Sequence, residues 1–405
     1  MRAVYLILVG VLWFVLPLNV FGQCMTENTI SREKIIPHKT VWLSDKDISD
    51  ELTIPNESMD IPYDDIQSVI DETLQETTNI FFSEIVDMFL SGNLLDAVKM
   101  SGQLIYDRTI AEIQTSLKTM LQLMGIALIA AVFANLSSAF AQKFVSESGF
   151  YLTYMMMAVM LTASFAGAVT VTQNILERLT DLMKAIVPVY TTVVTYSIGV
   201  TTGNIWYQFL MLLIVVVDWF LAGIVMRVVK IYVVLVMVNQ IASQDYFSKM
   251  TDLLRGAIHW SLKTILVVTL GLNVIQNMVL PAYDAVKNGW VTKLASAIPG
   301  IGTTFGMAAQ TALASAVLLK NAIGAAGVVI LCMACMWPML QLLLLTLMYK
   351  LLEALIQPVT DQRLLVCIHA VGEGIYMLCK CAATVLLLFI ISLAMMATFS
   401  GGLNI

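Results

Sequence analysis

Charged residues are scarce in this chain. Asp, Glu, Lys and Arg make up 12% of its 405 residues, whereas they make up about 25% of a typical soluble domain. So few charges cannot cover the surface of a soluble protein of this length, and 59% of the residues are hydrophobic. We therefore expect most of the chain to lie in lipid, which largely rules out a soluble enzyme or a nucleic-acid-binding protein.

Residues that build catalytic and metal sites are also few. The chain has three histidines and lacks an HExxH motif, a glycine-rich phosphate loop and a Ser/Lys pair at membrane depth. Most of its six cysteines lie in hydrophobic runs, where a thiol behaves as a small apolar side chain. Cys332 and Cys335 share a helix face, but no histidine or acid lies near them in the sequence. We expect no enzyme activity, no cofactor and no metal site.

Acidic and basic residues are divided unequally along the chain. Residues 23–118 hold eighteen acidic and seven basic residues, whereas residues 119–405 hold ten acidic and fourteen basic residues. The acidic front part has no electrostatic affinity for nucleic acid or anionic lipid. A small basic excess around apolar segments is typical of cytoplasmic loops between membrane spans.

The first 22 residues have the pattern of a secretory signal peptide. Arg2 supplies the positive charge, residues 3–20 are almost wholly apolar, and cleavage is expected after Gly22. An uncleaved membrane anchor is the alternative, because an apolar run of this length could also span a membrane. In both cases we expect the segment that follows to lie outside the cytoplasm.

The exported part divides into two regions. Residues 23–62 contain three prolines and no helical period, which predicts a flexible linker. In residues 63–118 apolar residues recur at steps of three and four with acids between them, which predicts acidic amphipathic helices with a turn at Ser91, Gly92 and Asn93. We expect these helices to dock on each other; the membrane surface or a partner are alternatives.

Residues 119–405 are expected to form an all-α polytopic membrane domain. Six hydrophobic segments are clear candidates for spans: 120–141, 151–175, 206–226, 264–281, 322–348 and 376–399. The segments 185–203 and 298–319 are rich in small residues and suit either a full span or a buried re-entrant segment. The segment 228–242 suits a short span or the end of a long helix. The pattern predicts about seven transmembrane helices.

Residues 185–283 and 297–400 resemble each other weakly. Each copy begins with a segment of small residues led by proline, at Pro188 and Pro299 respectively, and continues with a long apolar stretch, a polar link and a final span. This pattern predicts an internal duplication, of the kind that forms a pathway or a symmetric scaffold in membrane proteins. Chance similarity within the reduced alphabet of membrane sequence is the alternative.

Asp218 is the acid that lies deepest in an otherwise apolar run. A lone charge there costs at least about 2.5 to 3.5 kcal/mol on insertion scales, so a partner is expected. Three basic residues are candidates for this partner: Arg227, Lys230 and Lys380. We prefer a structural ion pair, with coupling to proton or ion movement as the alternative. Asp361 and Arg363, in a link beside a proline, are expected to be solvated.

The segment 300–327 is rich in small residues. Four of its glycines recur near helical spacing: Gly302, Gly306, Gly324 and Gly327. Small residues let helix backbones approach closely in lipid, where packing rather than hydrophobic burial drives helix association. We therefore expect this segment to pack at the centre of an assembly, whereas Leu343 and Leu387 are expected to face lipid.

Three motifs near the C-terminus carry a family resemblance. They are LLKNAIGAAG at residues 318–327, YKL at 349–351 and LIQPVTDQR at 355–363. Together with the plan of a signal peptide, an acidic amphipathic region and a polytopic domain, they resemble the stage III sporulation protein AE family. The resemblance covers nearly the whole chain and brings no catalytic residues with it.

The resemblance implies a role in endospore formation. Such proteins act with the other stage III sporulation proteins of the same mother-cell complex, which builds a channel or secretion-like apparatus and maintains forespore development after engulfment. It implies a multi-pass protein in the mother-cell membrane around the forespore, with the N-terminal region in the intermembrane space. Its helices are expected to contact membrane lipid, and no nucleic acid is expected to bind. An ion-coupled secondary transporter with duplicated halves, coupled through Asp218, is the alternative function.

The expected export signal makes a testable prediction. If cleavage follows Gly22 and residues 23–118 lie outside the cytoplasm, a protease added to spheroplasts prepared before engulfment is complete should remove an epitope inserted near Pro55. A cytoplasmic protein in the same spheroplasts is the control for intact membranes. An epitope that is digested only after lysis would contradict the predicted topology.

Overall fold

The computed structural model describes residues 143–197, 200–241, 246–295, 302–358, 360 and 362–398, together with isolated positions between 67 and 132. These residues belong to one compact unit, Tyr63–Ile405, and their regular secondary structure is helical throughout, as the sequence predicts. The expected signal peptide and linker lie outside the described residues. So do the acidic amphipathic region and the span at 120–141, apart from the isolated positions.

The described part of the chain forms a bundle of long helices. They are α5 (Lys143–Ser197), α6 (Val200–Val216), η1 (Val217–Val225), α7 (Met226–Ile241), α8 (Ser248–Ala295), α9 (Gly302–Ile356) and α10 (Gln362–Thr398). The π-helical segment η1 joins α6 to α7 without a break, so the three form one helix. Within the described residues five helices are long and apolar enough to cross a membrane. Each contains one of the clear hydrophobic segments between 151 and 398.

The ambiguous hydrophobic segments are parts of these long helices. Residues 185–197 end α5, residues 228–241 end α7, and residues 302–319 begin α9. Helices α5 and α9 have 55 residues each, which is about 80 Å of helix, whereas the hydrocarbon core of a bilayer is about 30 Å thick. These segments are therefore helix extensions rather than separate passes, and the described residues do not reach the expected seven spans.

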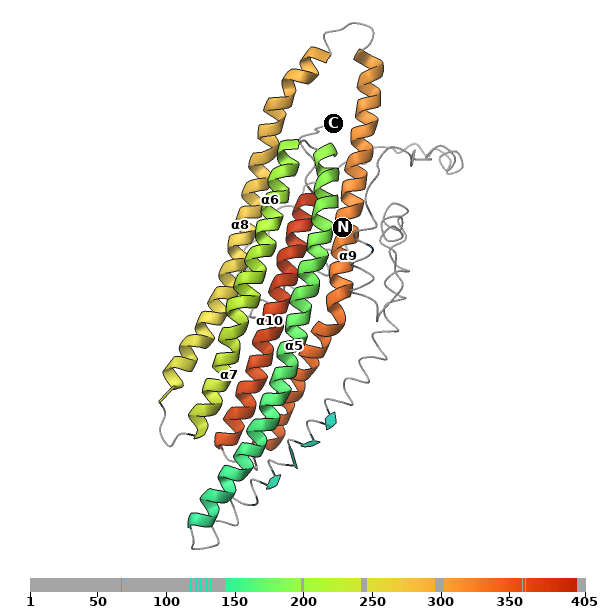
Figure 1. Ribbon diagram of the computed structural model, residues 1–405. Coiled ribbons are helices and arrows are strands. Elements are labelled where there is room, and N and C mark those ends of the chain that lie inside the picture. Colours follow the sequence, from blue (N-terminus) through green and yellow to red (C-terminus); the bar gives the residue numbers. More distant parts are fainter. Residues whose placement is uncertain are drawn as a thin grey trace, which may run out of the picture. The chain divides into compact units, whose positions relative to one another are not determined.

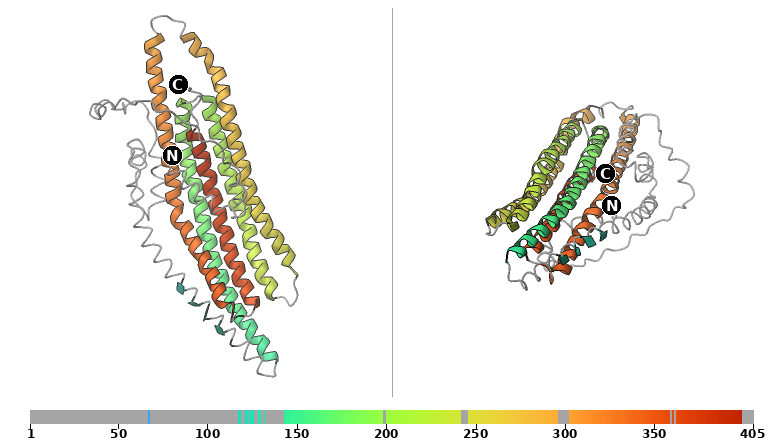
Figure 2. Two further views of the ribbon diagram at one scale, coloured as in Figure 1. Left: turned by 180° about the vertical axis from the view of Figure 1, so that it is seen from behind. Right: turned by 60° about the horizontal axis from the view of Figure 1, so that its bottom comes forward.

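Helix α10 is the centre of the bundle. It contacts α5, α7, α8, α9 and η1, and in Figure 1 it runs between α5 and the helix formed by α6, η1 and α7. The view from behind in Figure 2 keeps the same order. In the most apolar window of α10, 89% of the residues are buried, compared with 28% to 44% in the other four helices. Protein therefore encloses α10, whereas the other helices each present an outward face.

Helices α8 and α10 run in the same direction. Arg255 contacts Glu373 and Asn273 contacts Ser392, at sequence separations of 118 and 119. A nearly constant separation along two helices means that they are parallel. In the expected duplication these are the corresponding last helices of the two copies, and repeats related by an axis along the membrane normal would place them in this way. The duplication itself stays a prediction.

The close approach of α9 to α5 and α10 depends on a glycine. A Cβ atom added at Gly324 would lie 2.5 Å from the hydroxyl oxygen of Tyr190 on α5 and 3.0 Å from Cβ of Ala397 on α10. Both Gly324 and Tyr190 are fully enclosed at this junction of three helices. A larger residue would therefore require Tyr190 to shift or α9 to move away from its neighbours.

Gly327 lies at the same junction one turn further along α9. An added Cβ there would lie 3.4 Å from Leu393 and 3.5 Å from Ile186, which is close contact but leaves some room. Gly302 and Gly306 lie in the first turns of α9, where the structure does not describe the surroundings of the side chains. Close packing at small residues is therefore seen in the C-terminal half of the segment 300–327, at Gly324 and Gly327.

The two leucines expected to face lipid lie in different surroundings. Leu343 is 36% exposed on α9, whereas Leu387 is fully buried in α10. The prediction for Leu387 is wrong because hydropathy measures compatibility with apolar surroundings, and lipid and the interior of a helix bundle are equally apolar.

The glycine junction makes a testable prediction. Gly324→Leu should lower the thermal stability of the detergent-solubilised protein and its abundance in the membrane, because overpacking typically costs about 1 to 3 kcal/mol or more. Gly271→Leu on α8 is the matched control, since no heavy atom lies within 4 Å of its added Cβ. Equal stability of the two variants would contradict close packing at Gly324.

Candidate functional site: polar contacts around the central helix

A charged pair joins α8 to α10. Arg255 Nη2 donates a hydrogen bond of 2.8 Å to Glu373 Oε1, and the Glu373 side chain is 9% exposed whereas that of Arg255 is 47% exposed. Burying a carboxylate without a partner is costly. Arg255 therefore satisfies the charge of Glu373 while part of its own side chain stays outside the bundle, and the pair fixes the position of α8 along α10.

A second contact between the same helices involves a histidine. Lys380 Nζ lies 3.3 Å from His259 Nε2, and His259 Nδ1 lies 2.9 Å from the carbonyl oxygen of Arg255. A carbonyl oxygen can only accept, so Nδ1 carries the hydrogen and Nε2 accepts the hydrogen bond from the Lys380 ammonium.

Helix α9 also contributes to this group of polar contacts. The ring centroid of Tyr376 lies 4.2 Å from Lys380 Nζ and 5.2 Å from Lys350 Nζ, distances at which a cation is attracted to the aromatic face. His369 Nδ1 lies 2.9 Å from Glu353 Oε1. We call the following residues the polar cluster: Arg255, His259, Lys350, Glu353, His369, Glu373, Tyr376 and Lys380. It holds α8, α9 and α10 together.

Asp218 does not lie in the polar cluster. It is exposed in the first turn of η1, and no ion pair involves it in the described part of the chain. Arg227 and Lys230 follow on the same helix, roughly 13 and 18 Å further along the axis, which is too far for a contact. Lys380 contacts His259 instead. The structure therefore brings none of the three candidate partners to Asp218.

The remaining sequence-based candidates lie near the link between α9 and α10. Arg363 is exposed in the first turn of α10, and Asp361 lies outside the described residues. Sequence reasoning missed Lys320, which is fully buried in α9. A single lysine within a long run of apolar and small residues was the signal that could have identified it.

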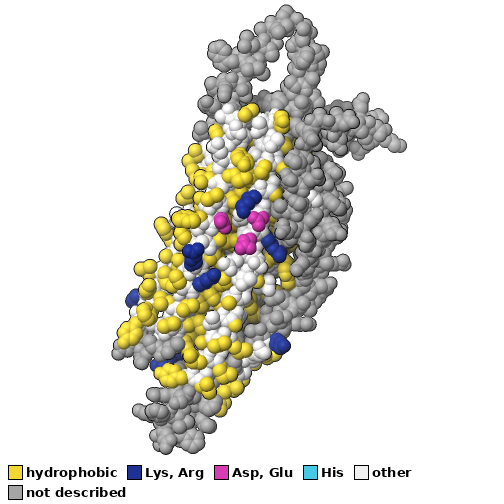
Figure 3. All heavy atoms as spheres, in the orientation of Figure 1, with side chains coloured by type: hydrophobic (Ala, Val, Ile, Leu, Met, Phe, Trp, Pro, Cys, Tyr) yellow, Lys and Arg dark blue, Asp and Glu magenta, His cyan; other side chains and the backbone are white. Residues whose placement is uncertain are grey.

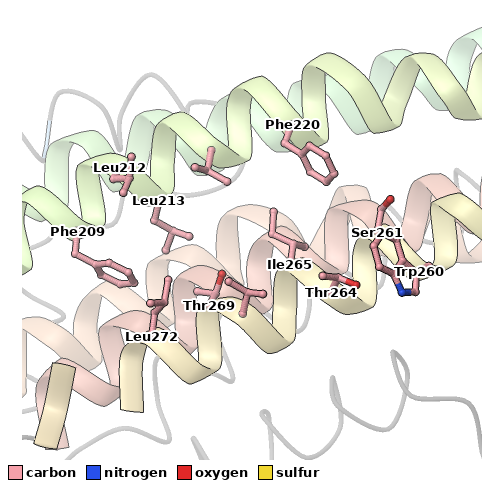
Figure 4. A pocket seen from close by; sticks show the side chains of 12 residues that line it. Phe209, Leu212, Leu213, Phe220, Trp260, Ser261, Thr264, Ile265, Thr269 and Leu272 are labelled. Carbon is pink, nitrogen blue, oxygen red and sulfur yellow. The ribbon is translucent and has the colours of Figure 1, made fainter. Parts of the chain in front are cut away.

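An apolar groove lies between α6 with η1 and α8. It has a volume of about 290 Å³, and no ionisable side chain lines it. Figure 4 labels side chains on its walls, among them Phe209, Leu213, Phe220, Trp260, Ile265 and Leu272. Within the described residues no group of three or more His, Cys, Asp or Glu residues could hold a metal ion. The groove suits an apolar occupant, and the ionisable contacts gather around α10 instead.

The charged pair makes a prediction that a double-mutant cycle can test. Arg255→Ala and Glu373→Ala should each lower the melting temperature in detergent, and the double variant should lose less than their sum, with a coupling free energy on the order of 1 kcal/mol. The control is the pair Asp181–Lys184, whose side chains are 58% and 56% exposed and whose coupling should be about 0.3 to 0.5 kcal/mol. Strict additivity for Arg255 and Glu373 would show that the pair does not join the helices.

Comparisons with known proteins identify the family of the chain. The family model described as Stage III sporulation protein AE matches residues 80–400, which include all the helices from α5 to α10. The curated Stage III sporulation protein AE of Bacillus subtilis (strain 168) is 25% identical over 286 residues, which are 68% of this chain and 71% of the relative. No solved structure matches the chain. The match implies a role in sporulation and a membrane protein rather than a member of an enzyme family, and the chain belongs to the stage III sporulation protein AE family.

Proposed function

We propose that the chain is a membrane component of a channel or secretion-like complex that connects the mother cell with the forespore. In this role it is needed for forespore development after engulfment. The observation that carries the proposal is the family match across residues 80–400, because that region holds every helix of the described bundle. A bundle of long helices joined by polar and close-packed contacts suits a stable subunit of such a complex.

The proposed location is the mother-cell membrane that surrounds the forespore. Five helices able to cross a membrane support a multi-pass protein. The signal-peptide pattern of the first 22 residues supports export of residues 23–118, which we place in the intermembrane space. The proposed partners are the other stage III sporulation proteins of the same mother-cell complex.

One observation favours the alternative of an ion-coupled transporter. A π-helical segment within a long membrane helix is unusual and often marks a functional position, and η1 carries Asp218. The Asp218 side chain is nevertheless exposed, whereas a coupling site in a transporter is enclosed between helices near the middle of the membrane. We therefore prefer the channel component.

Purification from sporulating cells tests the proposal. The tagged chain, solubilised in detergent, should co-purify with other stage III sporulation proteins, and cells that lack the chain should complete engulfment but form few heat-resistant spores. A tagged polytopic protein of unrelated function from the same membranes is the control for non-specific recovery. Recovery of the chain alone, together with a normal spore yield in its absence, would overturn the proposed function.

A further inference from the structure

Helix α5 presents a stripe of polar side chains to the outside of the bundle. The exposed residues of the stripe are Gln173, Asn174, Glu177, Asp181, Lys184 and Thr192. At about 100° per residue they fall within one sector of the helix about 100° wide, and the opposite side of α5 is buried against its neighbours. We call these six residues the polar face.

The next helix extends this polar surface. Helix α5 packs against α6 and η1, and Asn204, Gln208 and Asp218 are exposed on them. Figure 3 shows acidic and basic side chains gathered midway along one face of the molecule, with hydrophobic side chains above and below them. The charges are therefore not confined to the ends of the helices, where headgroups or water would meet them.

Contacts with α10 place the polar face at the depth of the apolar core. Tyr154 contacts Cys367 and Tyr190 contacts Leu393, so α5 and α10 run in the same direction. Ile186 and Leu393 both lie against Gly327. Asp181 lies five residues before Ile186, roughly 8 Å along the helix axis, which makes it level with residues of α10 that are apolar and fully enclosed.

The polar face of α5 is unsuited to contact with the hydrocarbon of the lipid bilayer. Ionisable side chains at this depth in membrane proteins face the protein interior or a water-filled cavity, because lipid does not solvate them. Asp181 and Lys184 are paired at 2.9 Å, yet both side chains stay more than half exposed. No ion pair in the described part of the chain involves Glu177.

Water suits this surface better than a directly docked protein. The surface carries both signs of charge, and burying several exposed charges in a dry interface has a desolvation penalty that only well-placed partners would offset. Water solvates charges of both signs without such partners.

We propose that the polar face of α5, with the adjoining exposed residues of α6 and η1, lines a water-filled passage through the membrane that other subunits complete. This inference rests on the proposed function, because one bundle with an outward polar face does not enclose a passage.

Cysteine labelling in membranes from sporulating cells tests the inference. Asn174→Cys and Asp181→Cys place thiols on the polar face, and Val267→Cys places one on the outward face of α8, where Val267 is 56% exposed. Val267 matches Asp181 in depth, because it lies six residues before Asn273, which contacts Ser392 beside Leu393. The parent carries Cys24→Ser, and its remaining cysteines are buried or half-buried.

A membrane-impermeant maleimide is supplied to both sides of the membrane fragments. The two thiols on the polar face should react at least about ten times faster than Val267→Cys, since a thiol in hydrocarbon does not ionise to the reactive thiolate. Asn174→Cys removes no ion pair, so it still tests whether the polar face is exposed to water if Asp181→Cys lowers the amount of protein. Rates on the polar face that equal the Val267→Cys rate, in variants with normal abundance, would overturn the inference, whether lipid or protein covers the face.

The same variants separate this inference from the proposed function. The variants could co-purify with stage III proteins and support sporulation although their thiols do not react. The proposed passage would then be wrong, whereas the proposed function would be supported. If the thiols react but the chain has no such partners, the proposed function is wrong while the face is still aqueous.

Discussion

The enclosure of α10 by protein on nearly all sides is the constraint on which the rest of the bundle depends. In lipid, helices gain little from hydrophobic burial against one another, so their association depends on close contact and polar bonds. Small residues allow that contact on α10 itself: an added Cβ at Gly372 would lie 3.1 Å from Tyr349, and one at Gly374 would lie 3.0 Å from Phe165. Side chains of α5 and α9 therefore pack against the backbone of α10.

Enclosure also explains why the charged groups of α10 have partners. Glu373 and Lys380 extend from a helix with almost no outward face, so each must meet a polar group from another helix. Arg255 and His259 of α8 supply those groups. Directional contacts of this kind fix how far one helix is shifted along another, which apolar packing alone specifies weakly.

The sequence predicted the helices better than it predicted their contacts. Hydropathy located five of the expected spans because a span is a local property of about 20 residues. It could not show that α5 and α9 extend well beyond one span, nor that Leu387 is enclosed while Leu343 is exposed, because lipid and protein interior are alike in polarity. Hydropathy also could not identify His259 as the partner of Lys380, because pairing depends on which helices become neighbours.

The motifs that carry the family resemblance lie where α9 packs on its neighbours. Gly324 and Gly327, in the first motif, form the junction with α5 and α10, and Tyr349, in the second, lies against Gly372. Lys350, also in the second motif, lies over the ring of Tyr376. These residues of the first two motifs hold α9 against its neighbours, so their part in the described structure is helix packing. The polar face of α5 belongs to none of these motifs, so the passage that we propose depends on residues outside the motifs that carry the family resemblance.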